Sequence, residues 1–110
     1  MGVAKIKLVK EGCKNVLGGE TTTVDRLSLD CFKNLNYQFS IQNGALCKSL
    51  KVFVAKTDGP DMVEHSTYVM LGDKVSIVIR PIVSAGFLLL QIVNNETTDV
   101  KVGFTRTLSS

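Results

Sequence analysis

The side chains that could carry out chemistry are few and widely spaced. The 110-residue chain has one histidine, His65, and three cysteines, Cys13, Cys31 and Cys47. Nucleophilic catalysis requires a base beside the nucleophile and a third group that orients the base, and no local signature of this kind surrounds His65. A zinc site requires about four Cys or His ligands, mostly at short spacings. We therefore expect no catalytic residue, no metal and no cofactor, and we predict that the protein is not an enzyme.

The alternation around these side chains indicates structural roles for them. His65 lies in a run of alternating residue types, so we expect a half-buried strand histidine. Cys31 and Cys47 lie within apolar patterns, where cysteine packs as a small hydrophobic residue. The odd number of cysteines and the lack of a C-x-x-C pair favour free thiols over a disulfide scaffold.

Charge and aromatic content argue against nucleic-acid and membrane partners. The net charge is only +3, and no run of five like charges occurs. A platform for single-stranded nucleic acid needs exposed aromatic rings among basic residues. The best candidate is Phe53, between Lys51 and Lys56, and a packing role is favoured for it. The most apolar segment, residues 81–93, is shorter than the roughly 20 residues of a membrane-spanning helix.

The elements that would position these residues are predicted to be β-strands. In residues 36–42, Tyr37, Phe39 and Ile41 alternate with polar residues, and Asn43-Gly44 follows as a tight turn. Pro81 is expected to end a strand or to lie at a sheet edge, because it cannot donate to a ladder. No long segment keeps a helical apolar period. The expected strands cover residues 21–31, 36–42, 46–56, 62–71, 74–80, 87–93 and 100–108.

This pattern predicts an all-β protein with a single antiparallel β-sandwich, or barrel-like, domain of seven to eight strands. We place the domain at residues 21–110, with Ile77 and Leu89 in its core. Residues 1–20 are expected to form either an N-terminal arm or an edge strand guarded by lysines. Within them, residues 11–20 are expected to form a polar loop.

Five segments carry a family resemblance. Residues 22–27 form a threonine-rich lead into Val-Asp, residues 36–42 a tyrosine-centred strand, and residues 50–59 a strand that ends in an Asp-Gly turn. Residues 63–68 and 98–107 follow as a further strand and a terminal strand. From Thr21 to Thr107 the chain thus resembles small β-rich structural proteins in the virions of tailed bacteriophages. Phe32 departs from the pattern, which has a smaller or aliphatic residue there, and residues 1–20 have no counterpart.

The resemblance implies a non-enzymatic virion component present in many copies. The leading expectation is a capsid decoration or cement protein, which binds the assembled lattice and stabilises it by mass action. Its implied partners are the major capsid protein and copies of itself, as a trimer, and its location is the virion, assembled in the cytoplasm of the bacterial host. The alternatives are a tail or neck component and a receptor-binding module of a tail fibre.

The N-terminal segment supplies the candidate contact with the capsid. It is short, amphipathic and basic at one end, so it could add as a strand to an exposed sheet edge. The candidate capsid-contact arm comprises Lys5, Ile6, Lys7, Leu8 and Lys10. An ordinary edge strand of the same domain is the alternative.

Overall fold

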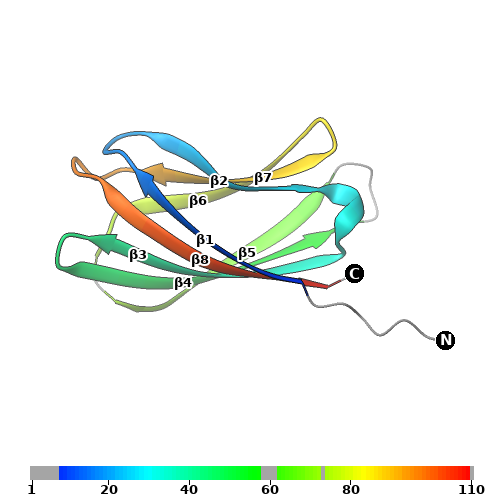
Figure 1. Cartoon of the computed structure of the whole chain (residues 1–110), viewed down its shortest axis with the longest axis horizontal. Coiled ribbons are helices and arrows are strands. Elements are labelled where there is room, and N and C mark those ends of the chain that lie inside the picture. The colour runs from blue at the N-terminus through cyan, green and yellow to red at the C-terminus, as the bar shows by residue number, and fades with distance from the viewer. Residues whose placement is uncertain (1–7, 58–61, 73, 110) are drawn as a thin grey trace.

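Two antiparallel sheets pack face to face in the computed structural model, which describes residues 8–57, 62–72 and 74–109 (Figure 1). The five-stranded sheet has the order β1 (Leu8–Val16), β8 (Val100–Ser109), β3 (Asn34–Asn43), β4 (Leu46–Lys56) and β5 (Val63–Gly72). The three-stranded sheet has the order β2 (Thr21–Ser28), β7 (Phe87–Asn94) and β6 (Ile77–Ser84). The predicted all-β sandwich is confirmed.

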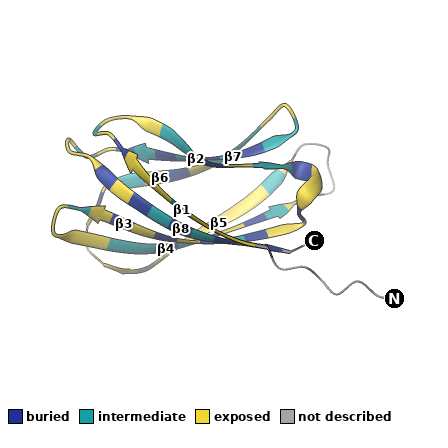
Figure 2. Ribbon diagram, in the orientation of Figure 1, coloured by how far each residue is buried: buried dark blue, intermediate teal, exposed yellow. Residues whose placement is uncertain are grey.

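The core lies between the sheets, and strands β3, β4, β7 and β8 contribute alternate residues to it. Tyr37, Phe39 and Ile41 of β3 are buried, as their spacing predicts. The rings of Tyr37, Phe39 and Phe104 lie 5.6 to 5.9 Å apart between centroids. Figure 2 shows the resulting alternation of buried and exposed bands along the strands. Full burial of each large apolar side chain contributes about 1.5–3 kcal/mol relative to exposure.

The first strand differs from the sequence expectation. Residues 11–16, predicted as a polar loop, continue β1, which pairs with β8 along its whole length as the edge of the five-stranded sheet. Gly12 resembles a loop residue in the sequence, yet packing favours glycine there, because a Cβ would clash with the Phe104 ring. An edge strand held mainly by backbone hydrogen bonds has little hydrophobic pattern to reveal it.

Three further boundaries and faces also differ. β2 ends at Ser28, and Leu29–Cys31 form a 3-10 turn in which the Ser28 hydroxyl accepts a hydrogen bond from the Asp30 amide. β6 begins at Ile77 rather than at residue 74 and continues past Pro81; the expected edge position of Pro81 is confirmed, because β6 is an edge strand. Leu89 points to the outer face of the three-stranded sheet, while Leu88 and Leu90 are buried.

Candidate functional site

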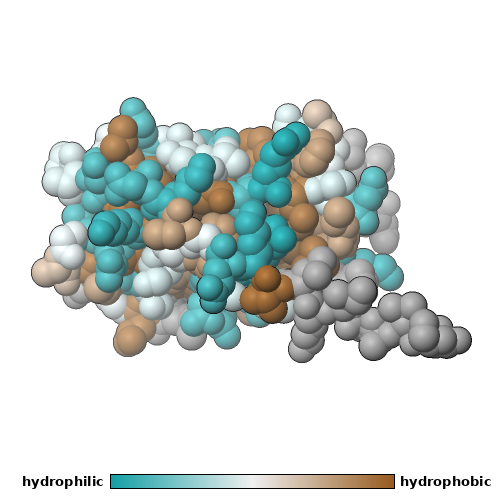
Figure 3. Space-filling model, viewed as in Figure 1, coloured by the Kyte–Doolittle hydropathy of each residue, from teal (hydrophilic) through white to brown (hydrophobic). Residues whose placement is uncertain are grey.

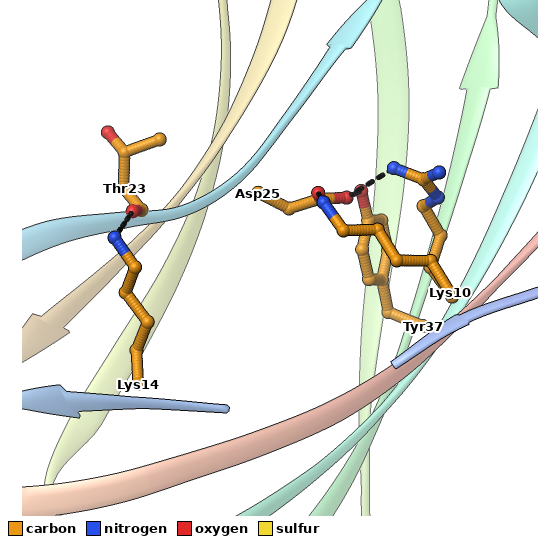
Figure 4. Close-up of polar contacts among 6 residues, drawn as sticks. Lys10, Lys14, Thr23, Asp25 and Tyr37 are labelled. Atoms are coloured by element: carbon orange, nitrogen blue, oxygen red, sulfur yellow. Dashed lines mark hydrogen bonds and ion pairs between the residues drawn. The ribbon is translucent and has the colours of Figure 1, made fainter. Parts of the chain in front are cut away.

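The densest group of charged and polar side chains lies inside the sandwich around Asp25 of β2. Its Oδ2 atom accepts hydrogen bonds from the Tyr37 hydroxyl at 2.6 Å and from Arg106 Nη1 at 2.8 Å. Its Oδ1 atom accepts one from Lys10 Nζ at 2.7 Å. Figure 4 shows Lys10 and Tyr37 converging on the carboxylate. Because the donors come from β3, β8 and β1, one side chain ties the three-stranded sheet to the five-stranded sheet.

A bulge in β2 explains why this carboxylate faces inward. The register with β7 shifts between Thr23 and Asp25, so that Val24 and Asp25 are both buried although they are adjacent in sequence. In a regular strand, consecutive side chains point to opposite faces. Bulges are a known means of re-aiming one side chain, and here the bulge directs Asp25 into the core.

The surroundings of this cluster favour the ionised form of Asp25 and the neutral form of Tyr37. Burial alone would raise the pKa of Asp25, but the hydrogen bonds from Lys10, Tyr37 and Arg106 outweigh it and hold that pKa below its ordinary value. Burial and the neighbouring Asp25 carboxylate raise the pKa of Tyr37 well above its ordinary value. Asp25 is therefore a buried carboxylate held in its ionised form by three donors from the five-stranded sheet.

The predicted contact arm falls only partly within the described residues. Lys5, Ile6 and Lys7 lie outside them, and Leu8 begins β1. Lys10 is half-exposed and directs its ammonium group to Asp25. The structure thus brings Lys10 together with Tyr37 and Arg106, a grouping that the sequence analysis missed. One signal was present in the sequence. In residues 100–108, Arg106 stands at one of the alternating positions that are otherwise apolar, and a charge that is buried with them requires a buried partner.

The histidine and the cysteines also differ from expectation. His65 is exposed rather than half-buried, because it lies on β5 at the sheet edge. Cys31 and Cys47, expected to pack as small hydrophobic residues, are exposed, as is Cys13. Among the residues that the structure describes, no three His, Cys, Asp or Glu side chains are grouped so as to hold a metal ion.

The strand β5 is the most exposed large apolar feature of the described chain. Exposed apolar side chains on or next to it are Met62, Tyr68, Val69 and Leu71, of which Leu71 is 74% exposed. Figure 2 shows β5 exposed along most of its length. In contrast, the face drawn in Figure 3 carries hydrophobic residues in small patches separated by hydrophilic ones.

The unequal width of the two sheets explains this exposure. His65, Thr67 and Val69 pair with Val54, Val52 and Leu50 of β4, so they face the same side as the buried core residues. They are nevertheless exposed, and Val69 is 62% exposed. Three strands do not extend far enough to cover a sheet of five, which leaves β5 open on its inner face as well as along its edge.

Comparison with known proteins leaves this surface as the main guide to function. No family model matches the chain, and no curated protein or solved structure matches it. Within the described ranges, no helix is long and apolar enough to cross a membrane.

Proposed function

We propose that this protein is a non-enzymatic virion structural protein that decorates an assembled capsid, and that β5 is the edge through which it contacts neighbouring chains. Its partners are the major capsid protein and further copies of itself. The virion assignment is supported by the sequence resemblance to small β-rich phage proteins described above. The observation that carries the contact is the long, apolar and exposed edge strand β5.

The sheet edges differ in how they are protected against pairing with other chains. Soluble proteins block edge strands with lysines, prolines or bulges. β1 contains Lys10 and Lys14, β2 has the bulge before Asp25, and β6 contains Arg80 and Pro81. In β5, residues 63–72 contain no Lys, Arg or Pro, and the one bulge, at Met70, lies near the end of the strand and leaves residues 63–69 regular.

A regular stretch of β5 is long enough to accept a strand. Val63 to Val69 pair without interruption with Lys56 to Leu50, before the register shifts at Met70. Among the described residues, β5 pairs with β4 alone, so its outer backbone groups are available to a partner strand. In strand addition the main chain supplies affinity and the side chains supply specificity. A protein that binds only the assembled lattice stabilises that lattice by mass action.

A co-sedimentation experiment with capsids that lack the protein tests the proposal. Two variants form a matched pair, because Val69 on β5 and Val9 on β1 are both 62% exposed. We expect Val69→Lys to weaken capsid binding at least about tenfold, or about 1.4 kcal/mol, because a lysine blocks strand pairing at an edge. Val9→Lys should bind as the unchanged protein does.

The outcomes separate the alternatives. Loss of binding in Val9→Lys alone would place the contact on β1, next to the predicted arm. No binding of the unchanged protein to capsids would refute the decoration role. Quantitative mass spectrometry of purified particles provides the second test. Hundreds of copies that scale with the major capsid protein support decoration, whereas a handful of copies indicate a tail or fibre component.

A further inference from the structure

The outer face of the five-stranded sheet carries an exposed pair of aromatic rings. Phe53 of β4 and Tyr68 of β5 are 40% and 56% exposed. Their ring centroids lie 5.8 Å apart at an interplanar angle of 73°, an edge-to-face arrangement. The sequence favoured packing on the second face of the strand for Phe53, and its ring does pack there, against Tyr68 on the solvent side of the sheet. Two large rings held together in water form a rigid apolar platform.

Most side chains around this platform are neutral and polar, and Lys51 and Glu64 are charged. By the strand register, Phe53 lies between Ser66 and Asn36, and Thr107 follows Asn36 on β8. Lys51, in the next row, lies between Tyr68 and Gln38. The region is therefore rich in amides and hydroxyls, which both donate and accept hydrogen bonds.

A hollow of about 300 Å³ lies beside Phe53. Its lining comes from β3, β4 and β5 and includes Asn34, Ala55, Glu64 and Ser66. Ala55 pairs with Asn34 on one side and with Glu64 on the other, so a small side chain lies between two polar ones. This volume is at the lower end of small-molecule sites, which span roughly 300–1,000 Å³.

We infer that this face binds a neutral hexose-based glycan. A pyranose ring presents C–H groups on one face and hydroxyls around its edge. The exposed part of the Phe53 ring suits the C–H side, and Asn34, Glu64 and Ser66 suit the hydroxyls. Each residue type in the hollow thus has a matching part on one sugar unit, and Tyr68 extends the platform toward a second unit.

Charge and area favour a glycan over other ligands. The two charges at this site, Lys51 and Glu64, are opposite in sign, whereas a polyanionic nucleic acid requires a basic surface. The exposed large apolar side chains on this part of the sheet are the two rings and Leu71, which is small for the core of a protein interface. The inference is independent of the proposed capsid contact, because a strand added to the edge of β5 extends the sheet and leaves its outer face open.

Amide-detected NMR titration of the full chain tests the inference. The probes are three neutral hexasaccharides, maltohexaose, cellohexaose and N-acetylchitohexaose, with the oligonucleotide dT12 as a fourth. We expect saturable shifts with at least one hexasaccharide, centred on residues 53–55 and 64–66. Tyr68→Ala and Phe53→Ala should each weaken that binding at least about tenfold. Val78→Ala, at an exposed position of β6 in the other sheet, should leave it unchanged.

Circular dichroism melts check that the variants fold, and Tyr68→Ala keeps the test valid if Phe53→Ala unfolds. The inference is overturned if none of the three hexasaccharides produces saturable shifts at this face. It is also overturned if only dT12 binds there with an affinity that falls steeply with added salt. If a hexasaccharide binds at this face but the protein does not bind capsids, the proposed function is refuted and this inference stands.

Discussion

Replacing Asp25 with asparagine should destabilise the protein more than any change of similar size on its surface. The side chain of Asp25 is fully buried, and that of Arg106 is nearly so. Removing the negative charge leaves the guanidinium of Arg106 buried without its counter-ion. Breaking a buried ion pair in this way costs about 3–5 kcal/mol, a large share of the roughly 5–15 kcal/mol that stabilises a typical domain.

Urea denaturation followed by far-ultraviolet circular dichroism measures this effect. With a denaturant dependence of about 1–3 kcal/mol/M, the midpoint of Asp25→Asn should fall by at least about 1 M. Lys10→Ala serves as the control from the same cluster. Lys10 is half-exposed whereas Arg106 is nearly buried, so solvent screens the charge of Lys10 more, and Lys10→Ala should lower the midpoint clearly less than Asp25→Asn.

A double-mutant cycle separates the charge pair from general disruption. Asp25→Leu and Arg106→Leu each remove one partner, and the variant that combines these two substitutions removes both charges. If the two charges stabilise each other, the double variant should lose less free energy of unfolding than the two single variants lose in sum, by about 1–3 kcal/mol. A loss below about 1 kcal/mol in Asp25→Asn, or strictly additive costs, would refute the structural role of the cluster.

The remaining predictions concern the pH dependence of stability, the core and one turn. Because folding lowers the pKa of Asp25, the ionised carboxylate contributes fully to the free energy of unfolding above its unfolded pKa near 4. This contribution declines as pH falls through the lower folded pKa. Urea midpoints measured from pH 5 to pH 2 should therefore fall less steeply in Asp25→Asn than in the unchanged protein. The pKa of Tyr37 is raised by folding, so stability should decline above about pH 10, where the unfolded chain ionises, and Tyr37→Phe should flatten that decline. Leu90→Ala should cost about 2–5 kcal/mol in urea denaturation, and Leu89→Ala clearly less, since only Leu90 is fully buried; equal costs would contradict the assigned faces of β7. Ala85 has a φ of +51° before Gly86 in the β6–β7 turn, so Ala85→Asn should stabilise by about 0.5–1 kcal/mol, seen as a higher melting temperature.

Parts of the fold could be predicted because their signal is local. Strand β3 has buried residues at every second position and polar residues between them, and such alternation appears wherever a sheet has one wet face. Strand β7 carried no such signal. It is apolar on both faces, so the sequence could not indicate that Leu90 faces the core while Leu89 faces outward. Residues 11–16 of β1 were mistaken for a loop because the edge position of the strand requires few buried side chains.

The candidate sites depend on contacts that are distant in the chain. Asp25 and Arg106 are 81 residues apart in the sequence, and their ion pair exists only because β2 and β8 face each other across the core. Phe53 and Tyr68 form a ring pair only because β4 and β5 are neighbours in the sheet. Neither grouping follows from spacing along the chain.

The sequence by itself determined that this chain forms an all-β sandwich. Its apolar residues recur at every second position, which is typical of β-strands, and no long segment has the 3.6-residue period of a helix. It also determined the inward face of β3, β4 and β8. Only the tertiary structure decided which strands lie at the edges, that β5 is left uncovered, and that Asp25 points into the core. The physical reason is that alternation reports which face of a strand is buried, whereas the neighbours of a strand are chosen by the packing of the whole chain.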